Sequence, residues 1–218
     1  ITQVLDEIKE RIPKKFTMLL GEIDSNKAVR ILCDMQLEEA VKFLVKIDSK
    51  KAAGFLCEMG SAKAGEVLDD MGKGTAAQLL ELLAELDLKK AAQLLKAMSE
   101  PDKVLDKMDT KKIARILREV NLEFAGGLLS GIGTKKAAEL LEDMDLKEAI
   151  SIFRWFDDAE KAATILCAIR EDYAIKMLLA SKGAYFILLE MRKGEQIAFL
   201  NKIMNEKEFP KILNEMDE

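Results

Sequence analysis

Apolar residues recur along most of the chain with a period of twelve residues. In the phrase GTKKAAELLEDM, residues 133–144, the apolar residues at the fifth, eighth, ninth and twelfth positions are Ala137, Leu140, Leu141 and Met144. This spacing puts them on one side of an α-helix, while the charged residues fall on the other sides. Each phrase of this kind therefore predicts one short amphipathic helix.

At least twelve related units follow one another from residue 24 to residue 169. The series includes DSNKAVRILCDM, DSKKAAGFLCEM, DLKKAAQLLKAM and DLKEAISIFRWF, and it is interrupted by a three-residue insertion at 84–86, the shortened SEPDKVLDKM and the thirteen-residue DDAEKAATILCAI. A helix of about nine residues is unstable alone, because nucleation costs too much for so few hydrogen bonds. Neighbouring units must stabilise one another, so the sequence predicts an all-α superhelical solenoid.

The joints between units carry residues that are typical of helix ends. The first position is Asp, Asn, Ser or Gly in most units: Asp24, Asp48, Gly60, Gly72, Asp87, Ser99, Asp109, Asn121, Gly133 and Asp145. These residues cap a helix start or accept the left-handed turn after a helix end. The second position alternates between a hydroxyl residue and leucine, as in Thr134 and Leu146. We therefore predict that the twelve-residue units pair, two by two, into a longer structural repeat of about 24 residues.

The fifth and sixth positions are small in most units, as in Ala52, Ala53, Gly65 and Gly126. Small residues let neighbouring helices approach closely. We predict one solenoid domain over residues 1–218, in which 1–23 form an N-terminal cap, 24–169 the repeats, and 170–218 longer helices and a C-terminal cap.

Charged residues also follow the repeat. Lysines gather at the third and fourth positions, whereas acids often occupy the tenth and eleventh, as in Glu142 and Asp143. Around a short turn, the acids that end one unit lie near the lysines that open the next. The pattern predicts a solvated ladder of weak ion pairs.

The phrase xxKAAxLLxxM, as in GTKKAAELLEDM and DLKKAAQLLKAM, resembles the intracellular N-terminal domain of MgtE-type magnesium transporters and, more distantly, the middle domain of the flagellar motor switch protein FliG. The resemblance implies a right-handed superhelix of short helices. In the transporters it also implies acidic residues that face a CBS domain and sense magnesium. This sequence lacks a CBS pair, a membrane segment and the frequent turn prolines, and lysine often stands where the transporters carry acids. For these reasons we assign no magnesium-site residue of the transporters to this sequence. What the resemblance still implies is a helical scaffold detached from the transporter.

Composition narrows the class of partner. The chain has 34 basic and 39 acidic residues and a net charge of -5, which gives no electrostatic reason to bind nucleic acid or an anionic membrane. No apolar run approaches the ~20 residues that span a bilayer, so we expect no direct membrane insertion. Three cysteines without CxxC spacing favour reduced thiols, which indicates an intracellular, cytoplasmic protein.

Residues that carry chemistry are scarce. The chain has no histidine, and it has no P-loop, dinucleotide-binding or nucleophile-elbow motif. We therefore expect no enzyme activity, no cofactor and no metal site. Two readings stay open: Cys33, Cys57 and Cys167 share the tenth position as small residues that pack on the flank, and the paired carboxylates of Asp69 and Asp70 suit weak binding of a divalent cation.

The pattern as a whole favours a protein-interaction or structural scaffold with a protein partner in a larger assembly. The alternative is a regulatory domain that senses Mg²⁺, which predicts acids that converge on one face.

Trp155 interrupts the charge pattern, because it holds the eleventh position, where other units carry Asp34, Glu58, Asp70 or Asp143. In one explanation, the thirteen-residue unit that follows shifts the register and the C-terminal helices cover the indole. In the other, Trp155 stays exposed beside Arg154 and anchors a protein partner, since Trp and Arg often dominate interface energy. The second explanation predicts that Trp155→Ala leaves helicity and melting nearly unchanged while it weakens partner binding.

Overall fold

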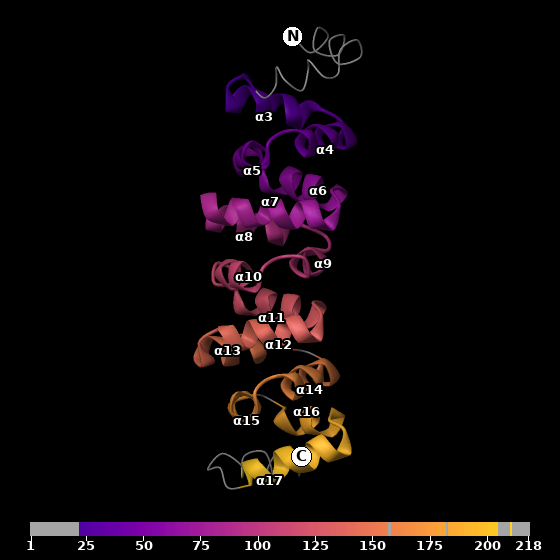
Figure 1. The fold of residues 1–218 in the computed structure, drawn as a ribbon, viewed down its shortest axis with the longest axis vertical. Coiled ribbons are helices and arrows are strands. Elements are labelled where there is room, and N and C mark those ends of the chain that lie inside the picture. The colour runs from indigo at the N-terminus through magenta and orange to yellow at the C-terminus, as the bar shows by residue number, and fades with distance from the viewer. Residues whose placement is uncertain (1–21, 157, 182, 205–209, 211–218) are drawn as a thin grey trace. The chain divides into compact units, whose positions relative to one another are not determined.

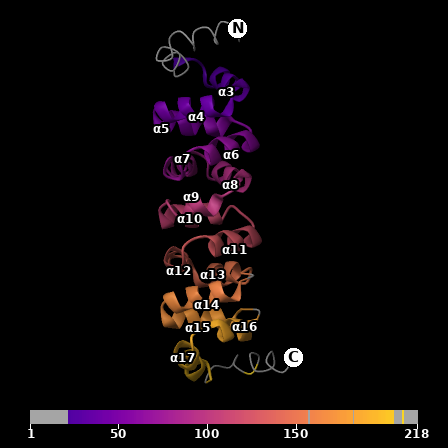
Figure 2. The same cartoon turned by 90° about the vertical axis from the view of Figure 1, so that its right-hand side faces the viewer.

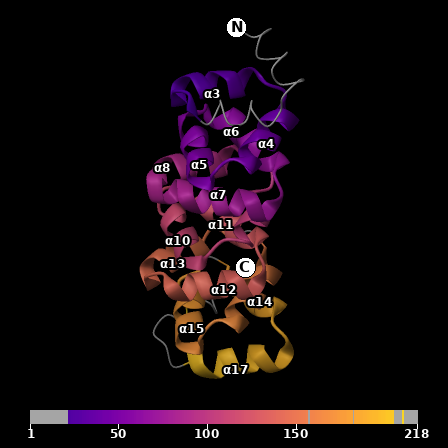
Figure 3. The ribbon, with the colours of Figure 1, turned by 45° about the horizontal axis from the view of Figure 1, so that its top comes forward.

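The computed structural model describes residues 22–156, 158–181, 183–204 and 210. In this part of the chain there are fifteen α-helices, α3 to α17, and no β-strand. Figure 1 labels these helices along the chain. Figures 2 and 3 show the same helices from two further directions. The predicted all-α fold is therefore confirmed, and twelve of the helices, α3 to α14, correspond to the twelve units counted between residues 24 and 169. The predicted N-terminal cap lies almost entirely outside the described residues.

The chain separates into two compact parts, residues 1–108 and 109–218, which we call the N-terminal half and the C-terminal half. The prediction of one domain over the whole chain stays a prediction. The N-terminal half contains seven of the described helices: α3 (Ser25–Asp34), α4 (Leu37–Lys46), α5 (Ser49–Glu58), α6 (Ser61–Asp70), α7 (Lys73–Leu86), α8 (Leu88–Ala97) and α9 (Pro101–Leu105). The insertion at 84–86 lengthens α7 to 14 residues, and the shortened unit forms the five-residue α9.

The C-terminal half contains eight of the described helices: α10 (Thr110–Leu117), α11 (Leu122–Gly131), α12 (Thr134–Asp143), α13 (Leu146–Phe153), α14 (Ala159–Ala168), α15 (Glu171–Leu179), α16 (Ala184–Glu190) and α17 (Lys193–Ile203). The expectation of longer helices after residue 170 is not met by α15 and α16, which have 9 and 7 residues, whereas α17, with 11, is one residue longer than most helices of the repeats. The long apolar stretch YAIKMLLASKGAYFILLEM is broken at Gly183, whose φ of 74° lies in the left-handed region that glycine tolerates.

Side chains at the first position cap six of the described helices, α3, α5, α8, α10, α11 and α13, as the sequence predicts. Asp48 and Asp109 each accept hydrogen bonds from two N–H groups of the first turn, and Asn121 accepts one from the N–H of Phe124. These bonds satisfy donors that a helix start otherwise leaves unpaired. Gly60, Gly72 and Gly133 occupy the same position with negative φ, so the left-handed turn that the sequence allowed is not used there.

Within each half, each helix packs mainly against the helix after next. In the N-terminal half, α3 packs on α5, α5 on α7, α4 on α6 and α6 on α8; in the C-terminal half, α10 packs on α12, α12 on α14 and α14 on α16, while α11, α13, α15 and α17 form a second series. Corresponding positions of such helices are two units apart, which confirms the predicted pairing of units. The buried residues in the described part are apolar or glycine, and no polar or charged residue there is buried.

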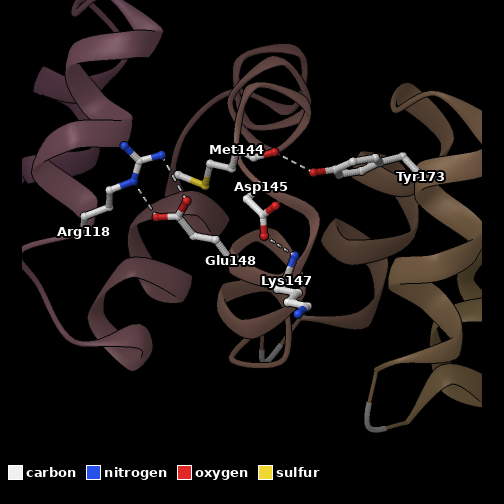
Figure 4. A network of polar contacts seen from close by, with 6 residues as sticks. All are labelled: Arg118, Met144, Asp145, Lys147, Glu148 and Tyr173. Carbon is white, nitrogen blue, oxygen red and sulfur yellow. Dashed lines mark hydrogen bonds and ion pairs between the residues drawn. The ribbon is translucent and has the colours of Figure 1, made fainter.

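Polar contacts tie some units to the third unit along the chain. The Nζ of Lys90, at a fourth position, donates to the carbonyl of Met59 at 2.6 Å, and the hydroxyl of Tyr173 donates to the carbonyl of Met144 at 2.7 Å. Figure 4 shows the second of these contacts beside the bidentate pair in which Arg118 donates to both carboxylate oxygens of Glu148, at 2.8 and 3.1 Å. At these places the ties span 29 to 31 residues, whereas the predicted ladder joined consecutive units.

Candidate functional site

Trp155 lies in the turn that follows α13, and its side chain reaches solvent. Its N–H donates to the carbonyl of Ile152 at 3.0 Å, which closes the turn after Phe153. The residue is 46% exposed, although α15, which follows it in the chain, packs on α13. The explanation in which the C-terminal helices cover the indole is therefore wrong for the described residues.

The backbone of Trp155 is held against α11 by a glycine. A Cβ built on Gly126 would lie 2.7 Å from the Cβ of Trp155 and 3.0 Å from its carbonyl oxygen, so no side chain fits there. Gly126 holds the sixth position of its unit, and Trp155 holds the eleventh position two units later. The N-terminal half repeats this arrangement, because a Cβ on Gly65 would lie 2.8 Å from the carbonyl oxygen of Ala97. The repeat geometry thus fixes the backbone of Trp155 and leaves its indole at the flank.

Arg154 is exposed, and its side chain reaches the next helix of the same series. Its Nε donates to the carbonyl of Ala180, just after α15, at 2.8 Å. This bond satisfies a carbonyl at a helix end and brings a positive charge to the negative end of the helix dipole. The two residues singled out in the sequence therefore both lie at the end of α13, where Trp155 packs against α11 and Arg154 bonds to the end of α15.

The carboxylates singled out as a candidate cation site are separated by their contacts. The Oδ2 of Asp69 accepts from the N–H of Ser99 at 2.8 Å, whereas Asp70 is exposed. Asp69 thus ties α6 to the joint after α8, and its other oxygen, Oδ1, is buried without a hydrogen-bond partner. Among the residues that the structure describes, no group of three or more His, Cys, Asp or Glu side chains is arranged to hold a metal ion.

All three cysteines carry free thiols, and they differ in surroundings. Cys33 and Cys167 are exposed and Cys57 is half-buried, and the Sγ of Cys167 lies 3.5 Å from Oε2 of Glu195 in α17. Partial burial of the sulfur, together with the hydrogen bond and the negative charge of Glu195, raises the pKa of the Cys167 thiol to about 11. The tenth position therefore serves here as a contact between α14 and α17.

We expect Cys167 to react slowly with iodoacetamide at pH 8, because a thiol with a pKa near 11 is only about 0.1% thiolate at that pH. Glu195→Gln keeps the shape of the side chain but removes its charge, so it should lower the pKa of Cys167 and speed the reaction. Site-resolved mass spectrometry gives both rates. A wild-type rate equal to that of a small free thiol would show that Cys167 is not held in its protonated form.

Several exposed apolar side chains of the C-terminal half escaped the sequence analysis. Phe186 and Leu189 on α16 are 61% and 52% exposed, and Ile197 on α17 is 52% exposed. If Ala184 is counted as a fifth position, Phe186 and Leu189 hold the seventh and tenth, where α12 carries Glu139 and Glu142. The same comparison that singled out Trp155 would have found them, had the register been extended past residue 170.

Comparison with known families agrees with the repeat. The family model of the MgtE intracellular N domain matches residues 86–182, which run from the end of α7 to the joint before α16 and include Arg154 and Trp155. The resemblance predicted from the repeats is thus confirmed for this segment. Searches of curated proteins and of solved structures gave no match. In the described part of the chain, no helix combines the length and the apolar character needed to cross a membrane.

Proposed function

We propose that this chain, whose residues 86–182 are similar to the MgtE intracellular N domain, is a non-catalytic helical scaffold that binds a protein partner through Trp155 and Arg154. The observation that carries the proposal is the exposure of Trp155, 46%, at a position where most of the other units carry a charged residue. Moving a large aromatic side chain from solvent into an interface is favourable, because its apolar surface leaves water. Trp and Arg are also the residue types most enriched among those that dominate binding energy.

The rigidity of the site supports this role. Gly126 and the turn after α13 fix the backbone of Trp155, and the hydrogen bond to Ala180 orients Arg154. Side chains on a fixed backbone lose less conformational entropy on binding than those on a mobile loop. The intracellular location named by the matched family and the reduced thiols support a cytoplasmic scaffold in a larger assembly.

Trp155→Ala should weaken binding of the partner by about 2 kcal/mol or more, which is roughly a 30-fold increase in Kd. Proteins that copurify with the tagged wild-type chain would first be identified by mass spectrometry, and the Kd of each would then be measured with both chains. Phe186→Ala is the matched control, because it removes another exposed aromatic side chain from the same half. Equal affinity of the wild type and the Trp155→Ala variant for every partner would refute the proposal.

The match to a domain of magnesium transporters favours one other function, the sensing of Mg²⁺. A sensor gains stability on binding the ion, because a ligand that binds only the folded state shifts the unfolding equilibrium. On the scaffold proposal, millimolar MgCl₂ should change the melting temperature no more than NaCl of equal ionic strength does. Circular dichroism melts at matched ionic strength would measure this. Saturable stabilisation by MgCl₂ alone would favour the sensor instead.

A further inference from the structure

The ends of α11, α13 and α15 together carry basic residues and no acidic residue. Their last turns and the residues just after them, 127–131, 151–155 and 176–180, contain two basic residues, Arg154 and Lys176, and no acidic residue. The whole chain has more acids than bases, 39 against 34. The corresponding part of α12 contains Glu139, Glu142 and Asp143. We call residues 127–131, 151–155 and 176–180 the basic edge.

The three segments of the basic edge are neighbours in space. α11 packs on α13, and α13 packs on α15. Gly126, directly before the first segment, touches Trp155, and Arg154 in the second segment bonds to Ala180 in the third. Lys176 lies one helical turn before Ala180, whose N–H donates to the carbonyl of Lys176 at 3.2 Å. Trp155 therefore belongs to a set of three neighbouring segments whose charged residues, Arg154 and Lys176, are both positive.

The segment of α11 in the basic edge begins at a residue without a side chain. Gly127 is exposed, and a Cβ built on it would have no atom within 4 Å. Among the described residues after Trp155, Asp158 is the first acid in the sequence. It accepts a hydrogen bond from the N–H of Lys161 at 3.0 Å and caps α14. Because Trp155 is 46% exposed, an apolar side chain of a partner has access to the indole, and the charged residues of the basic edge, Arg154 and Lys176, are both basic.

We infer that the partner presents an acidic segment, in which an apolar side chain packs on the indole of Trp155 and neighbouring carboxylates pair with Arg154 and Lys176. This inference rests on the proposed function and names the chemistry of its partner. Opposite charges around an apolar anchor raise the association rate and make binding dependent on salt. The net charge of the chain, -5, disfavours an acidic partner elsewhere, so the basic edge also orients the encounter.

The probe is a phage-displayed library of random 15-residue peptides, selected on the immobilised full chain. Enriched peptides should combine at least two Asp or Glu with one aromatic or aliphatic residue. A synthetic copy of an enriched peptide should bind the Lys176→Glu variant at least 10-fold more weakly than the wild type and should bind the wild type more weakly at 300 mM than at 50 mM NaCl. Lys111→Glu, an exposed lysine in the first turn of α10, is the charge-matched control and should leave the affinity unchanged.

The outcomes separate this inference from the proposed function. Peptides that need Trp155 but carry no excess of acids, or that bind the Lys176→Glu variant normally, would overturn the acidic partner and leave the Trp155 anchor standing. Peptides that bind the Trp155→Ala variant as well as the wild type would overturn both. A selection that enriches no peptide would overturn the inference, because the basic edge should then bind no short segment. Enrichment of basic peptides would have the same consequence.

Discussion

Gly126→Ala should lower the free energy of unfolding by about 1–2 kcal/mol, although alanine is the better helix former. A Cβ at this position would lie 2.7 Å from the Cβ of Trp155 and 3.1 Å from its carbonyl carbon, atoms that the backbone fixes. Overpacking of this kind costs about 1–3 kcal/mol, since helices must move apart to relieve it. The higher helix propensity of alanine offsets about 0.5–1 kcal/mol of this destabilisation.

The neighbouring glycine provides the control. Gly127 lies in the same helix and is exposed, and a Cβ built there would have no atom within 4 Å, so Gly127→Ala should raise stability by about 0.5–1 kcal/mol. Urea denaturation followed by circular dichroism would compare the two variants with the wild type. We expect the two substitutions to act in opposite directions and to differ by about 2 kcal/mol. Equal effects would mean that α11 does not approach the turn after α13 as closely as the structure has it.

The sequence predicted that glycine and alanine at the sixth position allow close approach, and it did not predict which residue approaches. In both halves the partner is the eleventh position two units later, as the contacts of Gly65 with Ala97 and of Gly126 with Trp155 show. Periodicity defines the buried face of each helix, because that face depends on the helix alone. The partner of a given side chain depends on the angle between successive helices, which the apolar spacing does not specify.

The polar ties illustrate the same limit. The ladder of ion pairs was predicted from sequence distance alone, because the acids that end one unit and the lysines that open the next are separated only by a short turn. The structure also brings Lys90 to the carbonyl of Met59 and Arg118 to Glu148, 31 and 30 residues away, which this reasoning did not predict. Such contacts depend on how alternate helices stack, and the residue pattern within one unit does not specify this stacking. The caps were predictable, because a first-position Asp such as Asp48 bonds only to the turn that follows it.

The sequence was sufficient to single out Trp155 as a candidate site residue, but not to predict whether its side chain is exposed. A tryptophan among charged residues at the eleventh position is visible in the sequence, and Phe186 and Leu189 would have been visible by the same comparison. Whether such a side chain is covered depends on helices that come later in the chain. The one-residue lengthening before α14 suggested a register shift over the indole, but Asp158 still begins α14 with a regular cap and the indole stays in solvent.

Phe153→Ala should destabilise the fold by about 3–5 kcal/mol, whereas Trp155→Ala, two residues away, should cost about 1–2 kcal/mol. Phe153 is 2% exposed and its ring centroid lies 4.9 Å from that of Phe156, so its loss leaves a cavity in the core of the C-terminal half. Trp155→Ala keeps the Cβ that packs on Gly126 and removes an indole that is half in solvent, so only part of its apolar surface is lost from the interior. This modest cost replaces the nearly unchanged melting expected from sequence.

Chemical denaturation of both variants, followed by circular dichroism because Trp155 is the one tryptophan, would measure the difference. If Phe153→Ala fails to fold, Phe153→Leu should still fold and should lose less than about 2 kcal/mol, because it refills most of the volume. Phe153 holds the ninth position, which faces the core, and Trp155 holds the eleventh, which faces solvent. Phe153→Ala should therefore destabilise the chain more than Trp155→Ala does. Should Trp155→Ala destabilise the chain as much as Phe153→Ala does, the indole would belong to the core, and its role as an anchor for a partner would lose its physical basis.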